Sequence, residues 1–530
     1  MKQERIQKYC VIALFLAYFI IGFLVFDDYG ISTDEPDERQ STFTNIKYTL
    51  DTIGIETLDG ADGDLENYIY KYYGIAMQIP PAMAEWALGF PDGADMWLLR
   101  HFWTFLVCFC SYVCFYCMCH EIFGSRGLGL LGTAMIALYP RFFAEQFYNI
   151  KDMMFTAMVI ISMFVTIRLI QSKYAIGWTV LFAIVSAFAT NVRIVGAIFP
   201  ILLLAYLWLL IFLKKFRIET GEYDKHIFRT SILIISIYLV TYIVLMPILW
   251  KNPIREIIAV FNRFSDYDVW NGSIVFMGKI ISGKEIPWYY IPVWLLISLP
   301  IWYLVLFVLV IGVLGFLLIK GVKKDKKLKV SILLKNKYMI WASLIGFLPW
   351  ITTVIMGSTL YNGWRHCYFI LPPMVFVIIG GIAYIWKRFN AIKILKMNIL
   401  FVVALGLTLQ CVWIVKNHPH EMVYLNLAAR SNGDDFDRDY WNVSLVELNQ
   451  YILENDDNPQ ITIDTPNSIF MRFLSKEDRE RIVLEDDNPM YIIDTYRGKT
   501  GNDNVMNGYE DWYSIEVDGY RIATVYKRKS

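Results

Sequence analysis

The chain has few charged residues and no excess of either sign. Lys, Arg, Asp and Glu make up 18% of its 530 residues and the formal net charge is zero, whereas soluble globular proteins carry roughly 25% charged residues. Without a basic excess, nothing points to nucleic-acid binding. Because 56% of the residues are hydrophobic, the composition excludes an ordinary soluble domain and indicates a membrane protein.

Cysteine is missing from the most polar part of the chain. All eight cysteines lie in or beside apolar runs, and residues 417–530 contain none, so no disulfide framework is indicated. Cys117-x-Cys119-His120 is better explained by apolar packing than by a metal site. A Gly-rich phosphate loop and a nucleotide-binding fingerprint are also missing.

The apolar runs predict about eleven membrane-spanning helices, each of the length that crosses ~30 Å of hydrocarbon. The fold class is therefore mainly α and polytopic. The run at 127–140 is short, and the run at 289–319 is interrupted by Pro300. The predicted segments are 9–26, 97–119, 127–140, 153–170, 176–191, 194–213, 230–249, 289–319, 338–356, 368–386 and 397–415.

The cations predict the orientation, because Lys and Arg in short loops stay cytoplasmic. The basic segments are 2–8, 214–229, 320–337 and 387–396, and all of them fall on one face if the spans alternate. The N-terminus is then cytoplasmic and the C-terminus extracytoplasmic. Phe26-Asp27-Asp28 offers no small-residue cleavage site, so the first span is expected to remain as an anchor.

This topology divides the chain into a membrane domain at 1–416 and an extracytoplasmic α/β domain at 417–530. The first outer loop, 27–96, contains two stretches that resemble amphipathic helices, about 41–53 and 65–87, of which the second suits the lipid headgroup layer as well as ordinary packing. In the tail, short strands are predicted at 460–464, 481–484 and 490–494, with a hairpin over 512–526 that turns at Asp518-Gly519.

Four clusters of ionisable residues are predicted at the outer membrane surface, where such side chains are costly and tend to be functional. They are Ser32–Arg39, Tyr139–Asp152, Asn191–Gly196 and Leu360–Tyr368. In the first, an aspartate among other acids would have a raised pKa and could act as a general base toward a hydroxyl. In the second cluster, two cations and two acids could bind a phosphate and orient an acceptor. In the third, Arg193 suggests a partner anion, and in the fourth Arg365 and His366 could stabilise the charge that develops on a phosphate leaving group.

Each cluster also has a simpler explanation. The acids could only enforce topology, the second cluster could be an aromatic interfacial loop, and Arg193 could extend its charged end to the membrane surface. Arg365 and His366 could belong to an aromatic belt. Their co-occurrence on one face favours a site.

The motifs resemble the GT-C glycosyltransferases that use polyprenyl phosphate donors, in particular bacterial relatives of the protein O-mannosyltransferases and the lipid A aminoarabinose transferase. Asp34-Glu35 resembles that family's acidic pair, and Pro140–Ala144 with Asn149-x-Lys151-Asp152 resembles its second outer loop. Gly363-Trp364-Arg365-His366 with Pro372-Pro373 is similar to a late segment. The tail motifs are His418-Pro419-His420, Tyr424-x-Asn426 and Asp439-Tyr440-Trp441.

The resemblance implies that a sugar moves, with inversion, from a polyprenyl phosphate to a hydroxyl of a glycan, lipid or protein acceptor in the cell envelope. Asp34 would be the catalytic base, with Glu35 beside it and Asp152 organising the site. No cofactor is certain, no metal ligands are assigned, and a divalent metal is left open because some GT-C enzymes use one. The donor phosphate would be bound by Arg141, Lys151, Arg193, Arg365 and His366.

The tail departs from the family pattern at two places. Related tails are expected to have Gly-Gly where Ala429–Asn432 stands, and Gly in place of Asn442. Two functions of other classes also stay open at this point, a polytopic secondary transporter and a non-catalytic assembly protein of the cell envelope.

Overall fold

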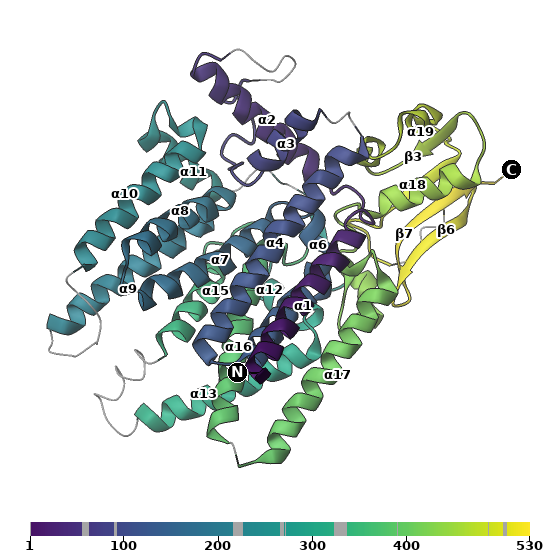
Figure 1. The fold of residues 1–530 in the computed structure, drawn as a ribbon. Helices are drawn as coiled ribbons and strands as arrows, with labels where there is room; N and C mark the ends of the chain where they lie inside the picture. The colour runs from purple at the N-terminus through teal and green to yellow at the C-terminus, as the bar shows by residue number, and fades with distance from the viewer. Residues whose placement is uncertain are drawn as a thin grey trace.

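The computed structural model is mainly helical, with a small sheet near the C-terminus (Figure 1). It describes residues 2–55, 63–89, 93–215, 226–265, 270, 272–322, 336–389, 391–485, 487–501 and 506–529. Most of the predicted basic segments 214–229 and 320–337 lie outside the described residues.

Long apolar helices confirm the polytopic membrane class. Eight helices are long and apolar enough to cross a membrane, and two bent helix pairs bring the number to as many as ten within the described ranges. With the shorter apolar helix α8 (Ile176–Val192), they coincide with the predicted segments. The eight candidate spans are formed by α1 (Lys2–Val25), α4 (Ala94–Phe123), α7 (Asp152–Gln171), η1–α9 (Ile194–Ala197, Ile198–Lys215), α10 (Ile227–Leu245), α15 (Lys337–Ile355), η3–α16 (Arg365–Ile370, Leu371–Arg388) and α17 (Lys393–Asn417).

The two bent pairs explain the two irregular apolar runs. Helices α5 (Arg126–Ala137) and α6 (Pro140–Tyr148) meet at 67°, and α12 (Tyr290–Ser298) meets the start of α13 (Ile301–Val322) at 117°. A proline stands at each break, Pro140 and Pro300. Proline cannot continue a helix, since it lacks the N–H donor and clashes with the preceding turn, but it suits the first turn of the next one.

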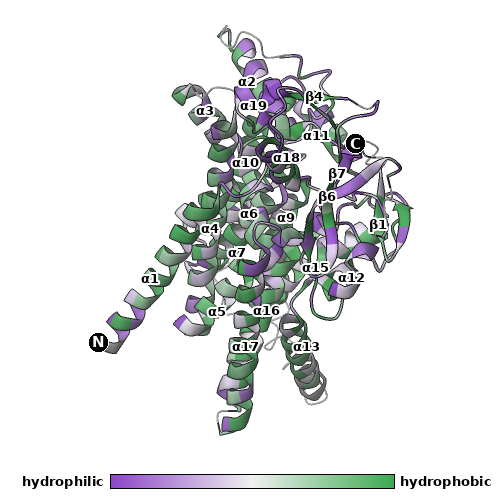
Figure 2. Ribbon diagram, turned by 90° about the vertical axis from the view of Figure 1, so that its right-hand side faces the viewer, coloured by the Kyte–Doolittle hydropathy of each residue, from purple (hydrophilic) through white to green (hydrophobic). Residues whose placement is uncertain are grey.

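Helices α7 and α16 form the centre of the bundle. Their apolar windows are 83% and 89% buried, against 11% for α1. Large hydrophobic side chains such as Leu24, Val244 and Phe401 are exposed on the outer helices, as expected for side chains that face lipid. Hydrophobic residues dominate α4, α7 and α16, whereas hydrophilic residues are frequent in α2 (Glu35–Thr52), α19 (Lys476–Arg481) and β6 (Tyr509–Val517) (Figure 2).

The polar elements gather at the end of the bundle opposite the N-terminus of α1 (Figure 1). They include the C-terminal sheet, and between the spans α2 (Glu35–Thr52), α3 (Ile79–Leu88), η2 (Pro247–Leu249), α11 (Pro253–Ser265) and the antiparallel pair β1 (Ser273–Phe276) and β2 (Lys279–Ser282).

The first outer loop is only partly as predicted. The stretch 41–53 falls almost entirely in α2, but residues 65–78 form turns, and a helix begins only at Ile79, ahead of Pro80-Pro81. The helix predicted over 65–87 is therefore wrong for its first half. Gly74 gives a reason, because its backbone packs so closely on Asn191 that an added Cβ would lie 2.0 Å from the Asn191 carbonyl oxygen.

The tail forms a five-stranded mixed sheet that matches the predicted strands. The strand order is β4-β3-β5-β7-β6, with β3 parallel to β4 and β5, and β7 antiparallel to β5 and β6. The hairpin turns at Asp518-Gly519, both with positive φ, as a tight two-residue turn requires. The elements are β3 (Ile461–Asp464), β4 (Ile482–Leu484), β5 (Tyr491–Asp494), β6 (Tyr509–Val517), β7 (Tyr520–Arg528), α18 (Ser444–Asn455), α19 (Lys476–Arg481), η4 (Glu421–Val423), η5 (Arg430–Asp435) and η6 (Ile469–Arg472).

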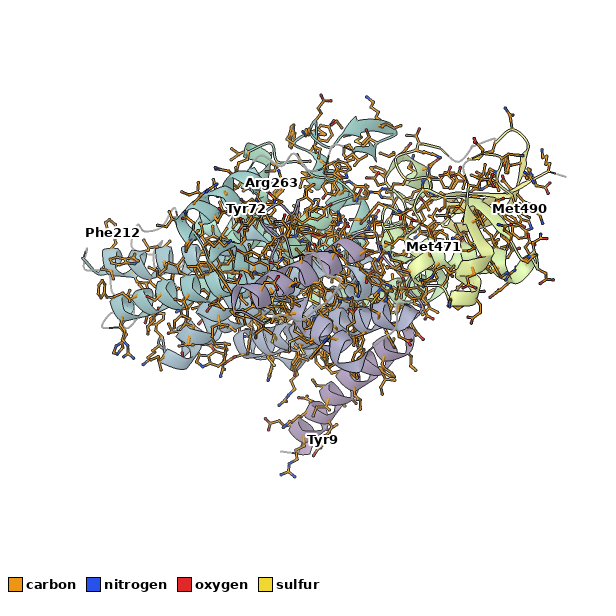
Figure 3. All side chains as sticks on the ribbon, turned by 90° about the horizontal axis from the view of Figure 1, so that it is seen from above. Tyr9, Tyr72, Phe212, Arg263, Met471 and Met490 are labelled. Carbon is orange, nitrogen blue, oxygen red and sulfur yellow. The ribbon has the colours of Figure 1, made fainter. Side chains whose placement is uncertain are left out.

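The sheet lies to one side of the bundle and is joined to it by specific contacts. Seen from above, Met471 and Met490 mark the tail on one side, and Phe212 of α9 lies on the other (Figure 3). The Asn426 amide donates to the carbonyls of Leu296 and Leu299, at 2.6 and 2.9 Å. These carbonyls lie where α12 ends, so the tail satisfies backbone groups that the bend leaves free.

Candidate functional site

A cavity of about 470 Å³ opens where α2, the loops between spans and the tail meet. All four predicted clusters contribute to its lining, although they come from segments far apart in the sequence. The acidic, basic and histidine side chains in the lining are Asp34, Asp37, Glu38, Lys151, Arg193, Arg365, His366 and Arg497.

Asp34 stands at the N-terminus of α2. The backbone N–H and hydroxyl of the preceding Thr33 donate to the Trp441 carbonyl at 3.0 and 2.9 Å, which ties this turn to the tail. The partial positive charge of a helix N-terminus favours a carboxylate at this position, although the Asp34 side chain accepts no capping hydrogen bond from the α2 backbone. The Asp34 side chain is 36% exposed and accepts a 2.8 Å ion-paired hydrogen bond from Arg365 Nη1.

The charge state of Asp34 corrects the sequence-based expectation. Neighbouring acids were expected to raise its pKa. Burial does act in that direction, but the Arg365 guanidinium outweighs it, so that the pKa of Asp34 is lowered from its usual value. In the acidic run Asp34–Glu38, the pKa of Asp37 is raised, because of burial and the charges of Asp34 and Glu38. Asp34 is thus held in the ionised form that a base needs.

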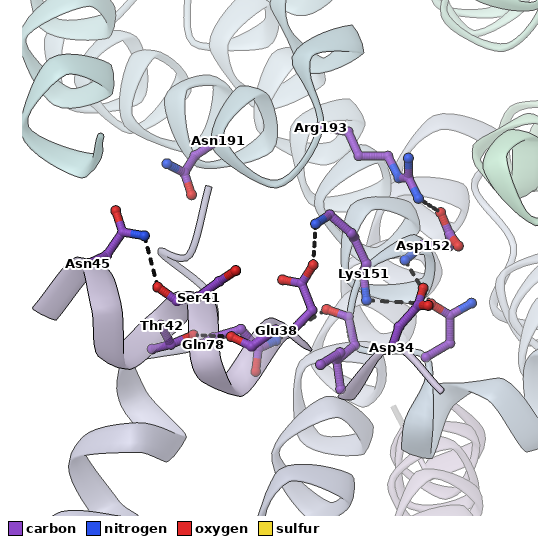
Figure 4. A network of polar contacts seen from close by, with 12 residues as sticks. Asp34, Glu38, Ser41, Thr42, Asn45, Gln78, Lys151, Asp152, Asn191 and Arg193 are labelled. Carbon is purple, nitrogen blue, oxygen red and sulfur yellow. Dashed lines mark hydrogen bonds and ion pairs between the residues drawn. The ribbon is translucent and has the colours of Figure 1, made fainter. Parts of the chain in front are cut away.

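Asp152 lies directly behind Arg365 and is almost fully buried. Its carboxylate is ion-paired with Arg193 Nη2 through one oxygen and with Arg365 Nη1, at 3.4 Å, through the other (Figure 4 draws the Arg193 pair). Its backbone N–H donates to Asn149 Oδ1 at 2.8 Å. Asp152 therefore holds two cavity cations in fixed positions.

Lys151 faces Glu38, with which it forms an ion pair (Figure 4). Its ammonium nitrogen also lies 3.8 Å from the centroid of the Tyr73 ring, a cation–π contact. Burial lowers the pKa of Lys151, and the charge of Glu38 opposes this shift.

Arg365 is positioned by a tight turn and two aromatic rings. Asn362 and Gly363, both with positive φ, turn the chain just before it. Its guanidinium carbon lies 4.4 Å from the Trp441 ring centroid and 5.0 Å from that of Tyr361. Arg365 Nε and Arg193 Nε are buried and have no hydrogen-bond partner, so each cation keeps a free donor.

His366 reaches the cavity without an ionic partner among the described residues. Its ring packs edge-on against Tyr361, with the centroids 4.6 Å apart, and its Nδ1 is buried and unpartnered. The described part of the chain has no group of three or more His, Cys, Asp or Glu side chains that could hold a metal ion.

Besides Asp152, which lies behind the lining, two other predicted site residues lie outside the cavity. Glu35 is fully buried, accepts a hydrogen bond from the Ser32 backbone N–H at 2.6 Å and lies 3.1 Å from His101 Nε2. Arg141 is buried under the tail, where its Nε donates to the Tyr424 carbonyl at 3.1 Å and its guanidinium lies 5.2 Å from the Trp294 ring centroid. Neither residue lines the cavity.

Sequence reasoning did not single out Glu38, Trp441 or Arg497 as site residues. Glu38 belongs to a recognised cluster, but its pairing with Lys151 is a tertiary contact. Arg497 follows β5, one of the parallel strands, and the carboxyl ends of parallel strands are common places for ligand-binding residues. The position of Arg497 directly after a predicted strand could therefore have marked it as a candidate site residue.

The departure at Asn442 has a backbone explanation. Asn442 has a φ of +59°, a conformation that Gly adopts freely and Asn more readily than other residues. Its amide donates to Thr33 Oγ1 at 3.3 Å and its Oδ1 accepts from Thr495 Oγ1 at 3.0 Å. Asn here therefore keeps the turn that a glycine would allow and adds two side-chain contacts.

No family model matches the chain, and no curated protein matches its sequence. Solved structures that resemble it include two of ArnT and one of AftD. Crystal structures of ArnT from Cupriavidus metallidurans, in the apo state and bound to undecaprenyl phosphate, each share 12% identity over 97% of both chains, with TM-scores of 0.47 and 0.46. The cryo-EM structure of the arabinofuranosyltransferase AftD from Mycobacteria shares 11% identity over 98% of this chain and 40% of AftD, with a TM-score of 0.43.

Proposed function

We propose that the protein is a membrane glycosyltransferase that moves a sugar, with inversion, from a polyprenyl phosphate to an acceptor hydroxyl on the extracytoplasmic side. The observation that carries the proposal is the single cavity in which an ionised, partly exposed Asp34 lies beside Lys151, Arg193 and Arg365. A base for the hydroxyl and cations for a phosphate are the groups that this reaction needs.

In the proposed reaction the acceptor hydroxyl oxygen attacks the anomeric carbon on the face opposite the phosphate. The bond from that carbon to the phosphate oxygen breaks, and its electron pair stays on the phosphate. The hydroxyl proton passes to Asp34. Since the lipid phosphate is already a good leaving group, the protein mainly holds the two substrates in line and stabilises the charge that develops on the phosphate.

The free donors of the cations support a phosphate in the cavity. Arg365 uses Nη1 for Asp34 and Asp152, and Arg193 uses Nη2 for Asp152, which leaves the Nε–H of each without a partner. A buried donor without an acceptor is costly, and a phosphate oxygen would satisfy it. Asp152 would organise the site by holding both guanidinium groups.

The deciding experiment compares Asp34→Asn with Asp37→Asn in liposomes that contain a polyprenyl-phosphate sugar. Asp37 is the matched control, because it lies in the same acidic run and lines the same cavity. Loss of a general base should reduce transfer at least ~10²-fold in Asp34→Asn, with a mild effect in Asp37→Asn. If the Asp34 variant keeps more than roughly a tenth of the activity at equal folded amount, Asp34 is not the base.

A further inference from the structure

The tail contributes one cation to the cavity. Arg497 follows β5 by three residues, is exposed, and lines the cavity together with Asp34 and Arg365. No hydrogen bond or ion pair joins its side chain to another residue of the described chain. It differs in this from Lys151, Arg193 and Arg365, each of which is paired with a carboxylate.

The residue before Arg497 holds the loop in an uncommon conformation. Tyr496 has a φ of +51° and is 1% exposed. Its hydroxyl lies 2.8 Å from Thr524 Oγ1 and 3.0 Å from the Tyr526 hydroxyl, and its backbone N–H donates to Asp494 Oδ1 at 2.8 Å. A bulky residue keeps such a backbone only where its surroundings fix it, so the direction of the chain at Arg497 is determined by packing.

A buried arginine fixes the other side of the same loop. Arg438 Nη2 donates to the carbonyls of Lys499 and Gly501, at 3.1 and 2.8 Å, and its guanidinium lies 4.4 Å from the Tyr496 ring centroid. The Lys499 ammonium is paired with Asp494 at 2.7 Å. The loop that carries Arg497 is therefore anchored on both sides.

The Arg497 loop is also linked to the turn that carries Asp34. Asn442 contacts Thr33, the neighbour of Asp34, and Thr495, two residues before Arg497. One side chain thus sets the position of both segments relative to each other.

Arg497 decides the balance of positive and negative charges around the cavity. Three carboxylates (Asp34, Asp37, Glu38) and three cations of the membrane helices and their loops (Lys151, Arg193, Arg365) line it, and the buried Asp152 adds a further negative charge behind them. Without Arg497 these groups carry one more negative than positive charge, which would repel a phosphodiester with its one negative charge. With Arg497 the positive and negative charges of the site are equal in number.

The acids around Arg497 are engaged elsewhere. Asp34, Asp437 and Asp439 are the carboxylates that act on it electrostatically. Asp34 is paired with Arg365, and Asp439 Oδ2 accepts from the Ser444 backbone N–H at 2.9 Å. Burial raises the pKa of Asp437 to about 7, so near neutral pH this group is ionised only in part. The guanidinium of Arg497 keeps its charge for a ligand.

We propose that Arg497 binds the phosphate of the lipid-linked donor, so that the tail supplies part of the active site. The inference rests on the proposed function. When the bond from the anomeric carbon to the phosphate oxygen breaks, the phosphodiester becomes a monoester and its charge changes from −1 to −2, while Asp34 takes the hydroxyl proton. Arg497 stabilises the phosphate before this step and its additional charge afterwards.

The test measures the Kd of the purified full-length protein for undecaprenyl phosphate in detergent, with undecaprenol as the lipid without phosphate. Arg497→Ala should weaken undecaprenyl phosphate binding roughly ten- to hundredfold, the effect of one lost charge-assisted hydrogen bond. Arg497→Lys should restore part of the affinity, because lysine keeps the positive charge but lacks the paired hydrogen-bond donors of the guanidinium group. Undecaprenol binding should stay unchanged in both variants.

Arg528→Ala is the matched control, since Arg528 is an exposed arginine of the same sheet and does not line the cavity. Wild-type affinity for undecaprenyl phosphate in Arg497→Ala, or a wild-type protein that does not bind this lipid, overturns the inference. The inference is also overturned if Arg497→Ala weakens binding of the acceptor but not of undecaprenyl phosphate. Arg497 would then bind an anionic group of the acceptor. The binding test does not depend on sugar transfer, so its failure would contradict the role of Arg497 and not the role of Asp34. Conversely, activity retained by Asp34→Asn would contradict only the proposed base.

Discussion

Arg365 Nη1 donates to Asp34 Oδ2 at 2.8 Å and joins two residues that are 331 positions apart in the chain. The same nitrogen lies 3.4 Å from Asp152 Oδ2. One guanidinium thus orients the proposed base, contacts the buried acid behind it, and keeps an unpartnered Nε for a ligand. This pair couples the proposed binding of the donor phosphate to the charge of the base.

Replacing Arg365 should impair the use of the donor. In Arg365→Ala we expect kcat/KM for the lipid donor to fall at least roughly a hundredfold, because charge-assisted hydrogen bonds to the phosphate and the orientation of Asp34 are lost together. Arg365→Lys should recover only part of this loss, since the forked geometry is missing. Donor kinetics are measured beside Arg388→Ala, an exposed arginine at the other end of α16. Unchanged kinetics in the alanine variant would remove Arg365 from the site.

Because of His418, the stability of the protein should decrease as the pH becomes alkaline. Its ring pairs with Asp28 at 2.8 Å and with Glu421 at 2.7 Å. Burial alone would lower its pKa, but hydrogen bonds and charges of Glu421 and Asp28 outweigh burial and raise the pKa to about 9. A raised pKa stabilises the fold fully below the unfolded value of about 6.5, and this contribution is lost as pH rises through about 9.

The expected result is a Tm that falls more steeply between neutral pH and about pH 9 in the wild type than in His418→Gln, as linkage requires. The measurement is a thermal melt in detergent at several pH values. Parallel curves for the two proteins would show that His418 does not contribute in this way.

Asn442 should tolerate glycine better than alanine. Asn442→Gly keeps the backbone at positive φ and loses only the contacts to Thr33 and Thr495, whereas Asn442→Ala also strains the backbone by about 1–2 kcal/mol. We therefore expect the alanine variant to have the lower Tm, and both variants to have reduced activity. Equal Tm values would mean that the φ of +59° is not required at this position.

The orientation of the protein remains a prediction from its charges. Residues 321–337 should lie on the cytoplasmic side and residues 440–530 outside. Single cysteines introduced into each segment of a cysteine-free variant, labelled with an impermeant reagent, test this directly. A tail labelled only after the membrane is opened would place the proposed site in the cytoplasm.

The features predictable from sequence were those with a local signal. Apolar runs predicted the helices, Pro300 indicated the break between α12 and α13, and Asp518-Gly519 predicted the hairpin turn. The meeting of the four clusters also followed from topology, since alternating spans bring them to one face. The aromatic stretch 65–78 resembled a helix, but its path depends on the contact between Gly74 and Asn191, which no local pattern encodes.

The charge states and the role of the tail were not predictable for the same reason. The acids around Asp34 are its neighbours in sequence and indicate a raised pKa, but the group that decides the shift is Arg365, which only the fold brings near. Arg497 carries no motif, and its importance depends on the pairing of the other cations with Glu38, Asp34 and Asp152.

The contacts of Asn442 with both Thr33 and Thr495 have a consequence for biosynthesis. A membrane protein is inserted from its N-terminus onward, so Asp34 is delivered among the first residues and Arg497 among the last. The turn that holds Asp34 cannot reach its final geometry until the tail has been synthesised, moved to the same side and folded. A chain interrupted before residue 495 would contain all the membrane helices of the described residues and still lack Thr495 and Arg497. Unfinished copies of the protein would therefore have an incomplete cavity.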